Sequence, residues 1–303
     1  MKRLIYLLVV CAGLASGCGN RYYARHILVP DKTVGNLASA FCGSDQHVLA
    51  QKRIDSTGRV RMADGAELAV WVIRGKQAQG RGTVAVLHGL GESKACYLPL
   101  GERLAGLGFD VVLIDLRGHG DSGGEYTTYG SLESRDVKAV LDNLLDAKSV
   151  HLPIYAFGPT LGGSAAIQYA AIDPRCKGVL ALTPYKDLVS AGRRMLFPLA
   201  PTMSSSHYDQ ILAEAGKIAR FDPAQASAVA AAPQVKCPLL LVHGWVDLSV
   251  PMEDSQEILK AAGGPKKLLD ITPLLEQILL EVTRDQWVAD RIDALAKEGI
   301  PKS

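Results

Sequence analysis

Residues 155–166, YAFGPTLGGSAA, place a hydroxyl-bearing side chain at a turn between a predicted strand and a predicted helix. Gly158 and Gly162 flank Thr160, and small neighbours permit the strained backbone that exposes a nucleophile at such a turn. Serine is the usual residue there, and a β-branched threonine tolerates positive φ less well. The stretch therefore predicts a nucleophile position at Thr160 and leaves open whether its hydroxyl reacts. A shifted frame would select Ser164, which would lie on the helix rather than on the turn.

Three more stretches place polar residues directly after apolar, strand-like runs. TVAVL leads into His88-Gly89-Leu90-Gly91, VVLI leads into DLRGHGDSGG at 115–124, and LLLV leads into HGWVDLSVP, which contains Asp247. The carboxyl ends of parallel strands meet at one edge of a sheet. We therefore expect these loops to gather around Thr160.

In this order, the four stretches resemble the α/β-hydrolases of the serine-aminopeptidase and monoacylglycerol-lipase-like group over roughly residues 57–300. The resemblance implies an ester or peptide hydrolase built on a Ser–His–Asp triad. It puts Thr160 at the serine position and Asp247 at the acid position. It also implies that the backbone N–H groups of Leu90 and Leu161 form the oxyanion hole.

The histidine of such a triad is missing. No histidine follows His243, and matching KKLLDITPLLEQILL to the family's pattern after the last strand puts Gln277 where the base belongs. A glutamine can orient a neighbour through a hydrogen bond, but it cannot accept a proton near neutral pH. The resemblance thus implies a degraded triad.

Other polar residues of these loops have a structural interpretation. We expect the ring of His88 to pack or hydrogen-bond locally, and the resemblance implies that Arg117 and His119 brace the loop at 115–124. The alternative interpretation of His119 is that it acts as a surrogate base for Thr160. His207 is the other candidate base.

The order of the predicted elements indicates an α/β protein. A turn at Asp64-Gly65 separates two extended runs, and apolar strands then alternate with amphipathic helices. This order predicts an α/β-hydrolase fold, with a mostly parallel sheet of the eight-stranded type and helices on both faces. The hydrolase domain is expected over residues 57–303. Residues 188–233 interrupt the alternation and are predicted to be a short cap insertion.

Residues 1–17 are predicted to be a lipoprotein signal peptide. Lys2 and Arg3 precede an apolar run that is too short to span a bilayer, and small residues then lead to Cys18. This pattern resembles the lipobox of bacterial lipoproteins, which implies lipidation of Cys18 and anchoring in the cell envelope, at the outer membrane or the periplasmic face. An ordinary cleaved signal and a short uncleaved anchor are the alternatives. Residues 18–56 have no clear period and are predicted to be a tether and an irregular N-terminal segment.

Composition argues against several classes of function. The 33 Lys and Arg residues nearly balance the 31 Asp and Glu residues, so the chain lacks the basic excess of a nucleic-acid-binding protein. The sequence contains no Cys/His cluster with metal-ligand spacing and no sign of an organic cofactor. The expected partners are the membrane, through Cys18, and a small-molecule, lipid or peptide ligand in the pocket.

Apart from Cys11 and Cys18, four cysteines remain, and an envelope location would permit disulfides among Cys42, Cys96, Cys176 and Cys237. Cys176 and Cys237 each precede an apolar strand-like run. If those strands are neighbours, the two cysteines could bridge. The alternative is that the cysteines are small buried hydrophobic residues.

Three functions remain open on sequence grounds. The favoured one is a non-catalytic hydrolase relative that keeps the pocket for binding, because the serine and the histidine of the triad are both replaced. The second is an active carboxylic-ester or peptide hydrolase that uses Thr160 with a surrogate histidine. The third is a structural or assembly protein.

Overall fold

The computed structural model describes residues 17–30, 53–77, 80–244, 247, 249–271 and 274–300. For residues 17–18 and 274–283 it describes the backbone alone. The predicted signal peptide, apart from Gly17, and residues 31–52 therefore lie outside the described residues.

The described residues build one eight-stranded sheet with the order β1-β2-β4-β3-β5-β6-β7-β8. Strands β1 and β2 form the predicted hairpin around Asp64-Gly65, and every pair from β4 onward across the sheet is parallel. This confirms the predicted α/β-hydrolase fold with a mostly parallel sheet. The strands are β1 (Ser56–Arg61), β2 (Glu67–Ile73), β3 (Thr83–Leu87), β4 (Asp110–Ile114), β5 (Ile154–Pro159), β6 (Cys176–Leu182), β7 (Leu239–Gly244) and β8 (Lys266–Ile271).

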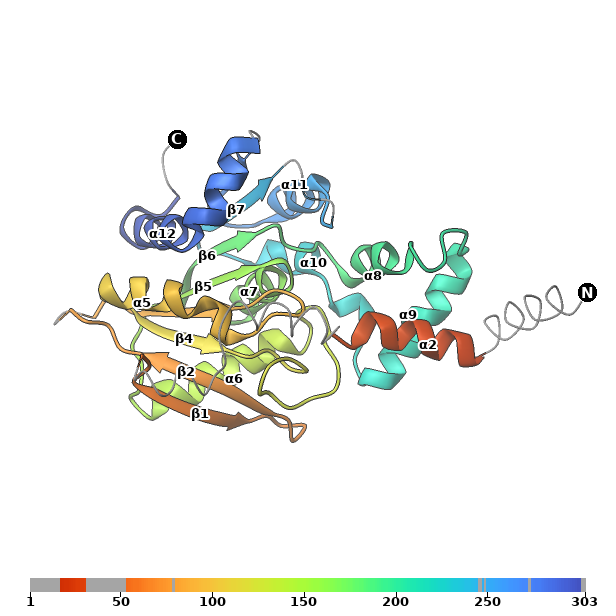
Figure 1. The fold of residues 1–303 in the computed structure, drawn as a ribbon, viewed down its shortest axis with the longest axis horizontal. Coiled ribbons are helices and arrows are strands. Elements are labelled where there is room, and N and C mark those ends of the chain that lie inside the picture. Colours follow the sequence, from red (N-terminus) through yellow and green to blue (C-terminus); the bar gives the residue numbers. More distant parts are fainter. Residues whose placement is uncertain are drawn as a thin grey trace, which may run out of the picture.

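Side chains alternate between the two faces of the central strands, and both faces are buried. Val84 and Val86 of β3 join one apolar cluster, whereas Ala85 and Leu87 join the other. Because both faces need cover, helices lie on each side of the sheet. Helices α5 (Leu98–Gly106) and α12 (Leu274–Glu298) cover one face, and α6 (Glu133–Asp146), α7 (Thr160–Ile172), α10 (Ala228–Ala231) and α11 (Met252–Ala261) cover the other (Figure 1).

The strand order reverses direction between β3 and β5. The chain leaves β3 toward β4 on one side, and it continues from β5 toward β6 on the other. Loops that diverge in this way leave a crevice at the carboxyl ends of the two strands, which is where open α/β sheets bind ligands. The fold therefore places the turn at Thr160 at the usual position of an active site.

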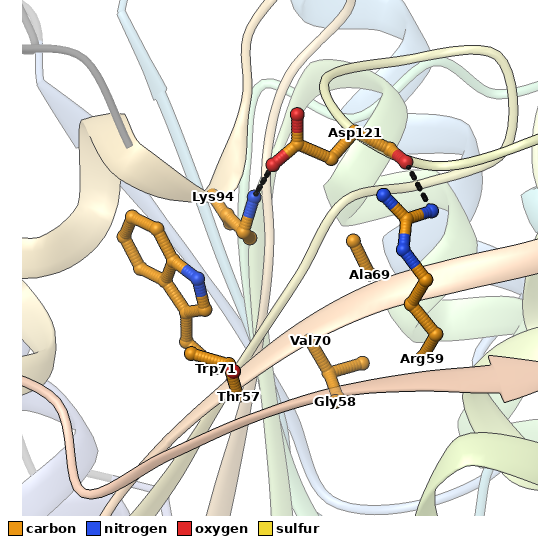
Figure 2. A pocket seen from close by; sticks show the side chains of 8 residues that line it. All are labelled: Thr57, Gly58, Arg59, Ala69, Val70, Trp71, Lys94 and Asp121. Atoms are coloured by element: carbon orange, nitrogen blue, oxygen red, sulfur yellow. Dashed lines mark hydrogen bonds and ion pairs between the residues drawn. The ribbon is translucent and has the colours of Figure 1, made fainter. Parts of the chain in front are cut away.

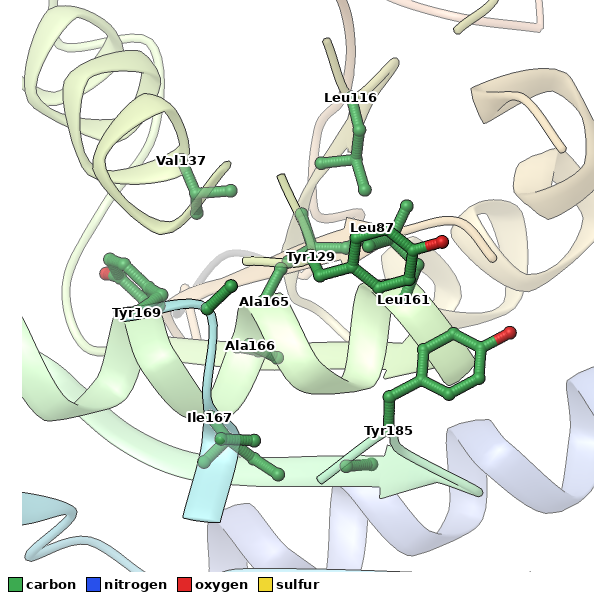
Figure 3. Close-up of a cluster of buried hydrophobic side chains, with 14 of the residues drawn as sticks. Leu87, Leu116, Tyr129, Val137, Leu161, Ala165, Ala166, Ile167, Tyr169 and Tyr185 are labelled. Atoms are coloured by element: carbon green, nitrogen blue, oxygen red, sulfur yellow. The ribbon is translucent and has the colours of Figure 1, made fainter. Parts of the chain in front are cut away.

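Helix α7 lies almost entirely inside the protein. Figure 3 shows its residues Leu161, Ala165 and Ile167 packed among side chains of β3, α6 and the loops after β4 and β6. A helix that is apolar on all sides is stable only when it is surrounded by protein. Its many Gly, Ala and Ser residues permit this close packing, and they hold the helix start in a fixed position.

Residues 188–233, the predicted cap insertion, are mainly helical. They contain α8 (Leu188–Leu196), α9 (Ser205–Ala219), the 3₁₀ helix η2 (Pro223–Gln225) and α10, which is followed by η3 (Ala232–Gln234). Ser204 and Asp187 cap α9 and α8 by accepting hydrogen bonds from backbone N–H groups in the first helical turn. The cap is thus a folded unit with its own helix-start signals.

The first part of the segment predicted to be a tether and irregular, residues 18–28, is instead helical, because Gly17–Leu28 form helix α2. Residues 31–52 of that segment lie outside the described part of the chain. Helix α2 lies against α8 and α9 of the cap (Figure 1). Tyr23, Ala24, Ile27 and Leu28 are buried, whereas Tyr22 is exposed. The sequence period of this segment is weak, and packing against the cap supplies the stabilisation that propensity alone does not.

Helix α12 begins earlier than its sequence pattern indicates. The periodic apolar residues predict a helix from about residue 284, but the helix extends from Leu274 to Glu298.

Among the described helices, none combines the length and apolar character needed to cross a membrane.

Candidate functional site

Thr160 occupies a strained turn between β5 and α7. Its φ is 40°, in the left-handed region that a β-branched residue rarely adopts. Pro159 just before it is extended, with φ −91° and ψ 156°. Such strain persists only where the surrounding structure enforces it, and it is common at functional sites.

Gly158 and Gly162 are required by close backbone approach. A Cβ atom on Gly162 would lie 2.2 Å from the carbonyl oxygen of Leu87, and one on Gly158 would lie 2.3 Å from the carbonyl carbon of Gly162. The turn at Thr160 is therefore pressed directly onto the end of β3. This contact brings the loop after β3 to the start of α7.

The ring of His88 joins two loops, as predicted. Its Nδ1 lies 2.7 Å from the carbonyl oxygen of Gly89, and its Nε2 accepts a hydrogen bond of 2.9 Å from the N–H of Leu116. Burial lowers the pKa of His88. The ring thus stays neutral, with both nitrogens engaged by backbone groups.

Leu90 and Leu161 lie on the two loops that meet at Thr160. A Cβ atom on Gly89 would lie 3.0 Å from Thr160 Oγ1, which places the backbone just before Leu90 beside the hydroxyl. Leu161 follows Thr160 in the first turn of α7. Their N–H groups remain the predicted oxyanion-hole donors.

Glu92 is a site residue that the sequence interpretation missed. Its Oε2 accepts hydrogen bonds from the N–H of Gly89, at 2.8 Å, and from the hydroxyl of Tyr97, at 2.6 Å. The same Oε2 would lie 2.9 Å from a Cβ on Gly89, so it flanks Gly89 together with Thr160 Oγ1. A carboxylate therefore stands beside the nucleophile position. Its place directly after the HGLG turn is the signal that could have revealed it.

Asp247 lies in the loop after β7, where the acid of a triad is expected. Its Oδ1 accepts hydrogen bonds from the N–H and hydroxyl of Ser249 and from the N–H of Val250, at 2.7–2.9 Å. Burial raises the pKa of Tyr185 to about 12, and the charge of Asp247 adds to this shift. The carbonyl oxygen of Tyr185 also accepts a 2.7 Å hydrogen bond from Ser164 Oγ of α7.

Ser164 lies inside α7 and has a structural role. Its hydroxyl is buried and also lies 3.1 Å from the carbonyl oxygen of Thr160. The shifted frame with Ser164 as nucleophile therefore has no support in this geometry.

Gln277 lies within α12, and its side chain falls outside the described residues. β8 ends at Ile271 and α12 begins at Leu274, so Gln277 lies on a helix rather than in an open loop. The position of its amide relative to Thr160 remains a prediction.

Neither surrogate base contacts Thr160 among the described residues. The Nδ1 of His119 lies 2.9 Å from the carbonyl oxygen of Arg117, and its ring packs on that of His88 at a centroid distance of 4.9 Å. His207 is held by α2, since its Nε2 lies 2.8 Å from Asn20 Oδ1. Within this part of the chain, no histidine nitrogen is hydrogen-bonded to the Thr160 hydroxyl.

Charged groups fix the loop at 115–124. Arg117 donates two hydrogen bonds to the buried carboxylate of Asp136, at 2.7 and 2.8 Å. Lys94 Nζ lies 2.8 Å from Asp115 and 3.0 Å from Asp121. Figure 2 shows Lys94 and Asp121 paired directly with each other, and both residues line a cavity of about 270 Å³ together with Trp71. These ion pairs give the loop the bracing role that the resemblance implies.

Comparisons with known proteins agree with this geometry. The family model for serine aminopeptidase S33 matches residues 78–221. The chain is 26% identical to human monoglyceride lipase over 250 residues, covering 69% of this chain and 82% of the lipase. It is also 26% identical over 211 residues to an uncharacterized protein of Mycobacterium tuberculosis, covering 69% of this chain and 67% of that protein. An esterase of Pyrococcus furiosus has the same fold, with a TM-score of 0.60, 22% identity, and coverage of 80% of this chain and 92% of the esterase.

The fold, the strained turn after β5 and the loops around it define an α/β-hydrolase architecture. With the matching family model and the esterase- and lipase-like relatives, the chain belongs to the α/β-hydrolase superfamily.

The neutral state of His119 gives a testable pH dependence. Burial, with a contribution from His88, lowers the pKa of His119 from 6.5 to about 4. Between these values the unfolded chain binds a proton that the folded chain does not, so the free energy of unfolding should fall as the pH drops from 6.5 toward 4. At pH 4.5 this contribution costs about 2–3 kcal/mol relative to pH 7.

Urea unfolding of the wild type and of His119→Gln at pH 7 and pH 4.5 measures this contribution. We expect the variant to lose less stability than the wild type between the two pH values. Equal losses would show that His119 is not held neutral.

Proposed function

We propose that this protein is an envelope lipoprotein that keeps the α/β-hydrolase frame to bind a lipid, peptide or small-molecule ligand and has little or no hydrolytic activity. The observation that carries the proposal is the environment of Thr160. Among the described residues, no histidine nitrogen is hydrogen-bonded to its hydroxyl, and the carboxylate of Glu92 flanks the same glycine. A negative charge next to the reaction centre disfavours an oxyanion.

The loss of the triad histidine has a large expected effect. A threonine hydroxyl is barely ionised at neutral pH without a positioned base. Loss of a triad member in a serine hydrolase leaves roughly a 10³–10⁴-fold acceleration over water. The methyl group of Thr160 also occupies space that an approaching acyl carbon needs.

A surface cavity next to the cap offers a place for a ligand, and its lining does not include Thr160. It has a volume of about 630 Å³ and lies between the end of α9 and the loop after β4, bordered by Arg117, Tyr126, Leu132 and Arg220. This volume is in the range of small-molecule sites. The mixture of charged and apolar borders suits an amphipathic ligand.

The alternative is an active carboxylic-ester or peptide hydrolase that uses Thr160. The esterase- and lipase-like relatives favour this alternative. The contacts of His119 and His207 disfavour both as the surrogate base. With both histidines disfavoured, the carboxylate of Glu92 would have to accept the proton of the Thr160 hydroxyl.

The location in the envelope has two supports. The first is the lipobox-like sequence that ends in Cys18. The second is that Cys96 is disulfide-bonded, since disulfides persist mainly in oxidising compartments.

Because Cys18 is at the start of α2, its lipid would hold the cap near the membrane. Phe197 and Leu199, 63% and 46% exposed after α8, would then lie on the part of the protein that carries the anchor.

Turnover of short-chain aryl esters and aminoacyl amides by the purified chain tests the catalytic part. We expect no turnover above the Thr160→Ala background, because the wild type lacks a base. The double variant Thr160→Ser, Gln277→His should gain activity if the frame and the oxyanion donors are intact. Wild-type turnover that is lost in Thr160→Ala would instead support the threonine hydrolase.

Metabolic labelling with a fatty acid tests the anchor. The wild type should incorporate the label and partition with membranes, whereas Cys18→Ser should do neither, because the acylated sulfur is removed. An unlabelled wild type, or equal labelling of both proteins, would contradict lipidation at Cys18.

A further inference from the structure

Two thiols lie next to each other at the edge of the sheet opposite the Thr160 site. Cys176 begins β6, and Cys237 lies two residues before the start of β7. The two strands are parallel neighbours, with Val179 beside Leu239 (Figure 1). The N–H of Val179 donates a 2.9 Å hydrogen bond to the carbonyl oxygen of Pro238, which fixes the chain next to Cys237. The register thus brings the two cysteines together, and both are free thiols in the structure.

The two thiols interact, and their environments differ. The proximity of the two thiols raises the pKa of Cys176 and lowers the pKa of Cys237, and the Cys176 thiol also donates to the carbonyl oxygen of Gly178 at 3.6 Å. Cys176 is buried, and Cys237 is half-buried. The positive charge of Lys177 further lowers the pKa of Cys237. Cys237 is therefore the more accessible and more readily ionised thiol, and Cys176 is placed to react with it second.

A surface cavity gives access to this pair. It has a volume of about 510 Å³, and its lining includes both cysteines, Lys177 and Lys236. Lys177 Nζ donates to the carbonyl oxygen of Pro174 at 3.0 Å and Lys236 Nζ to that of Pro233 at 2.7 Å. The lining also includes Asp173, whose carboxylate is paired with Arg175 and so does not cancel the lysine charges. Two fixed positive charges beside an accessible thiol favour a small anionic reactant.

We propose that Cys176 and Cys237 form a thiol–disulfide exchange site that is oxidised by a small anionic disulfide. The Cys237 thiolate attacks one sulfur of the small disulfide, forms a mixed disulfide and releases one thiolate. The Cys176 thiol passes its proton to the thiolate released in the first step, and its sulfur then attacks the Cys237 sulfur and releases the second thiolate. The product is one intramolecular disulfide, and the small disulfide is reduced to two thiols.

This bond would link the two ends of the cap-bearing segment. The cap helices α8 and α9 lie between Cys176 and Cys237 in the sequence, so the disulfide closes a loop that contains the whole cap. Closing a long loop limits the unfolded chain and raises stability. The site does not depend on ligand binding or on catalysis at Thr160, so it can hold or fail independently of the proposed function.

Oxidised glutathione is a suitable anionic probe, and peptide mapping gives a direct readout. Trypsin cleavage yields peptides 176–177 and 237–260. We expect these peptides to become linked after the protein, with Cys176 and Cys237 both present as free thiols, is incubated with oxidised glutathione. We also expect a melting temperature about 10 °C higher than that of the unlinked form. Persistence of both thiols in alkylatable form would overturn the proposal.

Single variants separate the order of attack from simple proximity. Cys176→Ser should retain a glutathione adduct on Cys237, because the second thiol is absent, whereas Cys237→Ser should react slowly at the buried Cys176. Equal adduct formation on both single variants would contradict the assigned order.

The cationic disulfide cystamine should react several-fold more slowly than oxidised glutathione with the wild type. A rate equal to or above that of glutathione would overturn the selectivity for anions.

Discussion

The site depends on the contact between the backbone at Gly162 and the end of β3. The carbonyl oxygens of Leu87 and His88 occupy the space where a side chain at residue 162 would project. This contact forces the chain to turn sharply at Thr160, and the burial of α7 keeps it in that position. The loop after β3, the strained residue and the first turn of α7 are therefore a single rigid assembly.

This assembly persists although two groups of a Ser–His–Asp triad are replaced in the sequence. Backbone donors such as the N–H groups of Leu90 and Leu161 do not depend on side-chain identity, so changes at Thr160 and Gln277 leave them untouched. The strain at Thr160 is costly for a β-branched residue. Its retention indicates that the turn is maintained by the packing of the whole domain rather than by the reactivity of one side chain.

Much of the fold could be predicted from the sequence, because its signals are local. The Asp64-Gly65 turn and the alternation of apolar runs with amphipathic helices predict the sheet and its cover. Helix α2 could not be predicted, since its burial depends on α8 and α9, which are distant in the sequence. The flanking glycines identify Thr160 as a site residue from the sequence alone. Glu92 can be identified only from the structure, because the folded loop brings its carboxylate to Gly89. The same limitation applies to Gln277, which lies on a helix that starts earlier than its apolar period indicates.

The most direct test of the central claim is the reaction of the purified wild-type protein with a fluorophosphonate, followed by mass spectrometry of residue 160. A hydrolase frame whose nucleophile is not activated should yield no adduct on Thr160, while human monoglyceride lipase in the same experiment serves as the reactive control. A stoichiometric adduct on Thr160 that forms on the folded protein, and does not form when the protein is denatured before the reagent is added, would contradict the account, because it would demonstrate an activated hydroxyl.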